Sequence, residues 1–173
     1  MNPREAPPSA RAQHIVDPRA ALAAVALLAV VMVALIAGVI IAARTAAEHA
    51  RIADNRTSLR QHAPSIITDV FSVDAARWQV DRARARSLVA ADFAGSFAAQ
   101  LRRAPSPGTA TVRWRPETVA LIDVGTDDGN VLVRASVTTR TDTGVQNTEY
   151  RTLRAGFERH DGTWLLRSAE VLT

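Results

Sequence analysis

The sequence predicts an α+β fold in which helices pack into the concave face of a strongly curved antiparallel sheet. Before the loop Ala104–Gly108, apolar residues recur at helical spacing, and after it they alternate with polar residues as in strands. Helices confined to the first part of a chain and strands to the second are typical of α+β proteins. A third observation is an uncharged stretch of 24 residues, Ala20–Ala43, followed by enough chain for one domain with a core.

The uncharged stretch predicts a transmembrane helix over residues 18–43, closed by Arg19 and Arg44. At about 1.5 Å per residue the stretch measures roughly 36 Å, which exceeds the hydrocarbon core of about 30 Å. Asp17 is the expected N-cap, and Pro18 suits the first helical position. A signal peptide has a shorter apolar region, and a core helix is rarely apolar all round, so an uncleaved span is favoured.

Residues 1–17 are rich in proline and poor in apolar side chains, so we expect a disordered cytoplasmic tail. Arginines flank the span in similar numbers on both sides, and the positive-inside rule therefore does not choose an orientation. Within the span, Ala34, Gly38 and Ala42 follow Ala26 at four-residue spacing, which would let another helix approach closely. The abundance of alanine explains the same pattern equally well.

Residues 44–63 continue the helical pattern and are expected to form a stalk, which Pro64 ends because proline lacks a backbone N–H. The cone-shaped domain then covers residues 64–173 and starts with a short apolar helix over "SIITDVF". Within that helix, Ile66 and Val70 share one face.

A second helical region follows, with Asp74 or Asp81 as a helix cap. Its apolar face is defined by Phe93, Phe97 and Leu101 at four-residue spacing. Gly95 is expected to mark a helix break or a close packing contact. Arg82, Arg84 and Arg86 are expected on a solvated face.

The second half of the chain predicts four or five strands in a meander. "TVRWR" alternates, and Pro116 after it ends that strand or marks an edge of the sheet. "TVALIDVG" is apolar on both faces. "VLVRASVTTR" places alternate apolar residues on one face. In the following strand, Tyr150 is out of phase with Leu153, and a bulge would reconcile them. Asp161-Gly162 predicts a type I′ hairpin turn before the last strand.

Composition narrows the possible chemistry. The chain has no cysteine, so it has neither a disulfide nor a thiolate nucleophile. All 21 basic residues are arginine, but they are interleaved with acids and the net charge is only +4, so no nucleic-acid partner is expected. The histidines show no metal-ligand spacing, and "DVGTDDGN" lacks the closing glutamate of a calcium loop. We expect no metal and no cofactor.

The order of these elements resembles the cone-shaped fold of nuclear transport factor 2 and ketosteroid isomerase. Three segments are similar to the Mce-associated membrane proteins of actinobacteria: the helix "ARARSLVAADFAGSFAAQLRRA", the strands "VALIDVGTDDGNVLVRASVTT" and the closing hairpin "RTLRAGFERHDGTWLLRSAEVL". Ala94-Gly95 stands where that family has Thr-Gly. The resemblance covers the span and nearly the whole domain.

The resemblance implies a protein of the cytoplasmic membrane, with its N-terminus inside and its C-terminal domain outside. It implies a non-enzymatic accessory or scaffold subunit that stabilises or positions an Mce complex importing sterols or fatty acids. Related cone domains on a single span occur in assembly proteins of type IV secretion. The expected partners are the membrane and the complex subunits.

Two alternatives remain open. A ketosteroid isomerase-like enzyme would need a general base and donors for an enolate, and the domain offers Tyr150 with Asp92, Asp123 and His160. A solvent-facing aspartate near a turn is the commoner explanation for Asp123, so no catalytic residue is assigned. The other alternative is a lipid-binding module whose ligand lies between helices and sheet.

Overall fold

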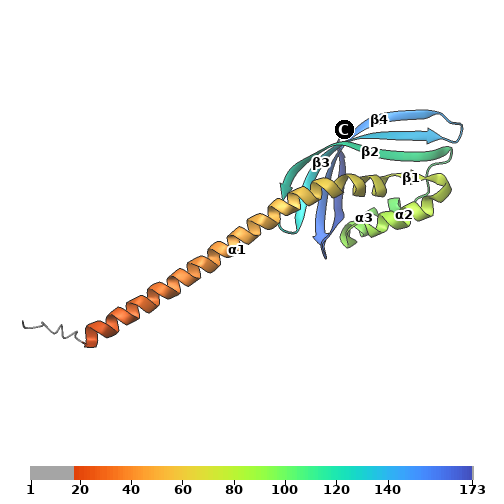
Figure 1. Ribbon diagram of the computed structural model, residues 1–173. Coiled ribbons are helices and arrows are strands. Elements are labelled where there is room, and N and C mark those ends of the chain that lie inside the picture. The colour runs from red at the N-terminus through yellow and green to blue at the C-terminus, as the bar shows by residue number, and fades with distance from the viewer. Residues whose placement is uncertain (1–17, 173) are drawn as a thin grey trace, which may run out of the picture. The chain divides into compact units, whose positions relative to one another are not determined.

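The computed structural model describes residues 18–172 and divides the chain into two compact units (Figure 1). The first unit ends at Ala46 and the second begins at Ala47. The predicted tail and the Asp17 cap lie outside the described residues. Helix α1, Pro18–Phe71, contributes to both units.

The described part of the first unit is the apolar part of α1. Its large side chains are exposed, from Leu22 at 72% to Val39 at 69%. By length and composition this helix can cross a membrane, and its most apolar window has no buried residue. A signal sequence near the N-terminus passes the same test, so the helix is a candidate anchor or signal sequence. Close association through Ala34, Gly38 and Ala42 stays a prediction.

The predicted helix end at Pro64 is wrong, because α1 continues through Pro64 to Phe71. The apolar stripe of the helix explains the continuation: its buried members keep helical spacing on both sides of the proline, at Leu59, Ala63, Ile66, Ile67 and Val70. Burial of this stripe offsets the lost backbone hydrogen bond. The part of the expected stalk from Ala47 onward therefore belongs to the second unit and supplies its core.

Short elements follow α1: β1 (Val73–Asp74), the 3₁₀ helix η1 (Ala75–Arg77), α2 (Trp78–Ser87) and α3 (Ala91–Leu101). Asp74 caps η1, as predicted, by accepting a hydrogen bond from the Ala76 backbone N–H at 3.0 Å. Gly95 neither breaks the helix nor packs closely, because α3 runs through it and an added Cβ would meet nothing within 4 Å. The break lies at Leu88–Ala90, which hydrogen-bonds to Leu166.

The α+β prediction is confirmed: the short helices pack on a curled, five-stranded antiparallel half-barrel. The strands pair in sequence order, and β1 is followed by β2 (Thr109–Val124), β3 (Asp128–Thr141), β4 (Gln146–His160) and β5 (Thr163–Leu172). In Figure 1 these strands curve over the C-terminal part of α1, drawn in yellow.

Two expectations about the strands are corrected. Pro116 does not end a strand, because β2 continues through it and a register shift between Pro116 and Thr118 absorbs the irregularity. The alternative of an edge position is confirmed, because β1 pairs with β2 at Thr111 and Val112 and leaves Pro116 paired with β3 on one side. No register shift separates Tyr150 from Leu153 in the β3–β4 pairing; the two side chains lie on opposite faces of the sheet. The type I′ prediction is confirmed, with positive φ at Asp161 (48°) and Gly162 (81°).

The core fills the space between α1 and the sheet. Phe157, Leu153 and Leu166 are fully buried beside the α1 stripe, and Trp164 is 3% exposed. Phe97 stands edge-on to Phe71 with ring centroids 5.9 Å apart, so α3 joins the same core. Side chains therefore occupy the concave face where it covers α1, whereas a groove of about 270 Å³ remains on the inner face beside Trp114, Val137 and Arg151.

Candidate functional site

The two residues favoured for an enzyme do not form one site. Asp123 is exposed on β2 and accepts hydrogen bonds from Asn130, from its backbone N–H at 3.0 Å and its side-chain amide at 2.7 Å. Tyr150 is 61% exposed on β4, with the Arg134 guanidinium 5.1 Å from its ring centroid. Their partners on β3, Asn130 and Ser136, are six residues apart, which is roughly 20 Å along the strand.

The other two candidates lie elsewhere. Asp92 is exposed in the first turn of α3. His160 is exposed at the end of β4, 3.4 Å from the carboxylate of Asp161. Among residues 18–172 no group of three or more His, Asp or Glu side chains could hold a metal ion. Chemistry that needs several of these groups around one substrate has no support from their positions.

A buried polar cluster, which the sequence did not reveal, fixes α1 to two turns of the sheet. Asn55 is 1% exposed, and its side-chain amide donates to the carbonyls of Gly125 (3.1 Å) and Thr126 (2.6 Å). Its amide oxygen accepts from the Arg159 guanidinium. One helical turn later, the Trp164 indole N–H donates to the hydroxyl of Ser58 at 3.0 Å. These bonds satisfy groups that would otherwise be buried unpaired.

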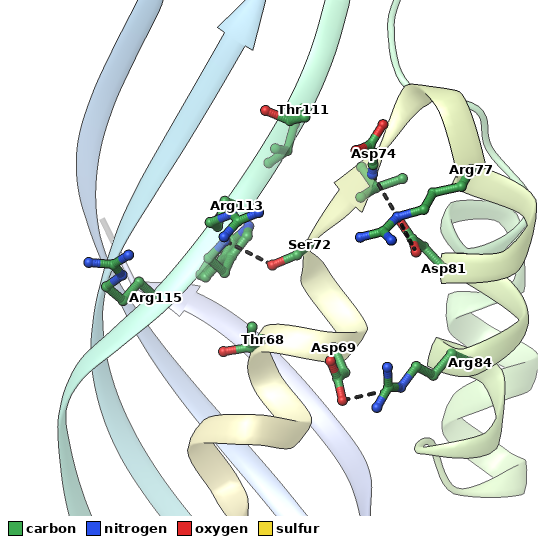
Figure 2. Close-up of a pocket in the computed structure, with 13 residues that line it drawn as sticks. Thr68, Asp69, Ser72, Asp74, Arg77, Asp81, Arg84, Thr111, Arg113 and Arg115 are labelled. Atoms are coloured by element: carbon green, nitrogen blue, oxygen red, sulfur yellow. Dashed lines mark hydrogen bonds and ion pairs between the residues drawn. The ribbon is translucent and has the colours of Figure 1, made fainter.

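A polar groove of about 320 Å³ lies between β2 and the segment from the end of α1 to α2 (Figure 2). Ser72 ties its two sides together by accepting a hydrogen bond from the Trp114 backbone N–H at 3.0 Å. The groove is lined by Thr68, Asp69, Ser72, Val73, Asp74, Arg77, Asp81, Arg84, Thr111, Val112, Arg113, Trp114 and Arg115.

The acidic side chains of this groove are engaged by their neighbours. Arg84 lies 3.4 Å from Asp69, and Arg77 lies 3.6 Å from Asp81. The other oxygen of Asp81 accepts from the Asp74 backbone N–H at 2.8 Å. Figure 2 shows these contacts on the helical side of the groove. The positive charges on the β2 side are therefore not neutralised by them.

A second groove of about 410 Å³ shares Asp74, Thr111, Arg113 and Arg115 with the first. It extends across the outer face of the sheet, the face opposite the buried side chains. Every residue that lines it is polar: Asp74, Thr111, Arg113, Arg115, Ser136, Thr138, Arg140 and Gln146. This surface is the strongest candidate for a binding site.

We call Arg113, Arg115, Arg134 and Arg140 the arginine face. Arg113 and Arg115 are alternate residues of β2, and their register partners are Thr138 and Ser136 of β3. Arg140 and Arg134 flank these two β3 residues at alternate positions. All four side chains therefore project from the same side of β2 and β3, and all four are exposed.

Exposed arginines without an ion pair also occur elsewhere among the described residues, for example Arg60 and Arg103, and the arginine face is distinguished by having four of them together on two adjacent strands. Within the described residues none of its four guanidinium groups forms an ion pair, and Arg134 only covers the Tyr150 ring. On the inner face of the same sheet, by contrast, Arg151 binds Glu149 at 2.6 Å. The outer face thus carries four guanidinium groups without an ion-pair partner, and Asp74 supplies the one carboxylate among the described residues that line the groove across it.

Arg82 departs from the solvated face expected for it. Its side chain is half-buried and donates to the Val70 carbonyl at 3.2 Å, whereas its Nε has no partner. Desolvation lowers the pKa of Arg82, and the charge of Asp81 partly offsets this effect. Arg84 and Arg86 are exposed as predicted.

Sequence reasoning missed the arginine face, although one signal was present. The alternation in "TVRWR" already placed Arg113 and Arg115 on the face opposite Trp114. Counted from the β2–β3 turn, the register of Arg113 and Arg115 against β3 depends on two shifts, between Leu121 and Asp123 and between Pro116 and Thr118, and a single sequence does not specify them.

Comparison with known proteins gives a likeness in fold. No protein-family model matches the chain, and no curated protein matches it. The chain is similar to the crystal structure of an IcmL-like type IV secretion system protein from Legionella pneumophila, with a TM-score of 0.54 and 12% sequence identity. The similarity covers 68% of this chain and 91% of that one. At this identity the likeness shows the fold alone.

Proposed function

We propose that this chain is a membrane-anchored, non-enzymatic scaffold or accessory subunit of a protein complex in the cell envelope. The observation that carries the proposal is the dual character of α1. Its first part exposes only apolar side chains along its most hydrophobic stretch, and its last part supplies the core stripe of the second unit. One element thus serves as anchor and as structural centre of the domain.

The geometry of the second unit supports a binding role over a chemical one. The residues considered for catalysis are exposed and separated, and the space between α1 and the sheet is filled by Phe157, Leu153 and Leu166. A lipid-binding module or an isomerase would need an open cavity there. The groove that remains on the inner face is lined partly by polar and charged side chains, among them Glu149 and Arg151. The polar grooves and the arginine face lie on the outside, where another protein can reach them.

The orientation of the chain and the identity of its partners are proposed from the resemblance to Mce-associated membrane proteins. On that basis the N-terminus is cytoplasmic, the second unit is extracytoplasmic, and the partners are subunits of an Mce-type importer of sterols or fatty acids. The segments that carry the resemblance include α3 and the β4–β5 hairpin.

An assembly scaffold related to type IV secretion is the second candidate. The likeness in fold to the IcmL-like secretion protein favours it by analogy. In both candidates a curled sheet domain is carried on a single span and has no catalytic activity. They differ in the complex to which the protein belongs, a lipid importer or a secretion system.

The anchor and its orientation are tested by cysteine labelling, which the absence of native cysteine makes clean. We expect Ala99→Cys on the exposed surface of α3 to react with a membrane-impermeant maleimide in intact cells, and Ser9→Cys to react only after lysis. Equal labelling of both positions, or a mature chain that lacks residues 1–43, would contradict an uncleaved span with its N-terminus inside.

The scaffold role is tested by purifying the tagged full chain from a mild detergent extract. We expect stoichiometric subunits of one transport or secretion complex, and the identity of those subunits decides between the two candidates. Recovery of the protein alone would argue against both, and turnover of a steroid enone by the purified chain would revive the enzyme.

A further inference from the structure

We propose that the arginine face binds an extended acidic segment of a partner protein. The inference rests on the proposed function, because the partner is taken to be a subunit of the same complex. It adds the surface, the sign of the charge and the conformation of the bound segment.

The charge of the surface favours a carboxylate-bearing partner. Four exposed guanidinium groups lie on two adjacent strands, and within the described residues none of them has a carboxylate partner. Like charges so close together repel one another in the free protein. An acidic partner removes this repulsion and forms charge-assisted hydrogen bonds with guanidinium donors.

The spacing of the surface favours an extended segment. Arg113 and Arg115 are alternate residues of one strand, so their Cα atoms lie about 6.7 Å apart. Alternate side chains of an extended peptide have the same separation, and Asp or Glu at such positions can face both arginines. Beside the arginines, the half-buried Thr138 and the exposed Gln146 offer a hydroxyl and an amide group for the peptide backbone, and Ser136 beneath them is buried.

The composition of the surface argues against two other polyanions. The groove across the arginine face has only polar lining residues, so it has no apolar side chain to insert among lipid chains. Tyr150 is the single described aromatic side chain on this face, and Arg134 covers one side of its ring, so the surface lacks the series of aromatic rings on which successive bases stack.

The test measures binding of a fluorescent peptide of alternating Glu and Thr to the full chain in nanodiscs of neutral phosphatidylcholine. We expect R113Q/R115Q to weaken binding about tenfold, because two guanidinium–carboxylate contacts are lost. The matched control is R60Q/R103Q, which removes the same charge from two exposed arginines on α1 and after α3 and leaves the affinity unchanged. Circular dichroism checks that each variant is folded.

Several results would overturn the inference. They are an equal loss of affinity in the two double variants, equal binding of a Gln-Thr peptide, and tighter binding of anionic vesicles or of a single-stranded oligonucleotide than of the acidic peptide. Raising the salt concentration must weaken binding, since the contacts are exposed.

A second measurement separates this inference from the proposed function. If the wild-type chain co-purifies with complex subunits and R113Q/R115Q retains them, the scaffold stands and the arginine face is the wrong surface. If the wild-type chain has no partners but binds the peptide, the surface stands and the scaffold proposal fails. Loss of subunits from R113Q/R115Q alone, with crosslinks from Thr138 to an acidic segment, supports both.

Discussion

At the scale of single residues, Asn55 is the polar group on which the attachment of α1 to the sheet depends. Its side chain is almost fully buried and bonds to two carbonyls and one guanidinium in elements far from it in sequence. Each of these partners lies in or next to a turn between strands. A single amide thus holds α1 against the β2–β3 and β4–β5 turns.

Asn55→Ala is expected to lower the free energy of unfolding by about 2–4 kcal/mol, because buried partners left without hydrogen bonds cost about 1–3 kcal/mol each. The measurement is urea unfolding of the full chain in detergent, followed by tryptophan fluorescence. Arg56→Ala, an exposed neighbour on the same helix, is the control and should change little. Equal stability of the two variants would show that the Asn55 cluster contributes nothing.

The same residue shows where a single sequence stops being informative. Asn55 stands in a polar, arginine-rich stretch, and nothing in its neighbourhood distinguishes it from the exposed Asp54 beside it. Its partners lie about 70 to 104 residues further along the chain. The arginine face has the same origin: its members were each visible as strand residues, but their grouping requires the register of two strands.

At the scale of elements, Pro64 in the interior of α1 is the clearest conflict between local preference and packing. Proline removes one helical hydrogen bond and crowds the carbonyl four residues earlier. The Thr68 hydroxyl donates to the Pro64 carbonyl at 2.9 Å, and the residues around Pro64 are buried in the core. Packing therefore decides the path of the helix.

Pro64→Ala is expected to keep the fold and to raise the free energy of unfolding by about 1–2 kcal/mol, since it restores the missing N–H of the helix. Thermal unfolding followed by circular dichroism gives the comparison, with Ser65→Ala as a neighbouring control. A loss of stability would mean that the proline ring fits this site better than the restored hydrogen bond does.

The elements of the sheet were more accessible to sequence reasoning than the helices were. Alternation in "VLVRASVTTR" predicted the buried face of β3 correctly, because Val131, Val133 and Ala135 are all buried. The prediction of an Asp-Gly turn before β5 was also correct, because the residues that adopt positive φ angles in such turns are few and Asp-Gly is among them. Helix ends were predicted wrongly at Pro64 and Gly95. Proline and glycine lower the local stability of a helix, but tertiary contacts outweigh this loss.

At the scale of the whole molecule, the second unit contains all the residues of the core cluster. The stripe on α1, the short helices and the sheet all lie after Ala46. The apolar part of the first unit contributes none of the cluster. The apolar segment of the first unit and the fold of the second unit are therefore separable at this boundary.

A chain that begins at Ala47 is expected to fold in aqueous solution without detergent and to retain the circular dichroism and unfolding transition of the second unit. Heteronuclear NMR of this chain provides the check, with dispersed amide signals as the expected result. A chain that begins at Pro64 is the matched comparison: it lacks Asn55, Leu59 and Ala63 and should fail to fold. Aggregation of both chains would show that the fold needs the apolar part of α1.

The position of the core stripe at the start of the second unit has a consequence for synthesis of the protein on the ribosome. Leu59 is made 107 residues before Leu166, its companion in the core. At about 5–20 residues per second, the stripe waits roughly 5 to 20 s for the last strand. During that interval the apolar stripe of α1 is exposed to solvent outside the ribosome. We therefore expect nascent chains to need a chaperone that holds them until the β4–β5 hairpin is complete.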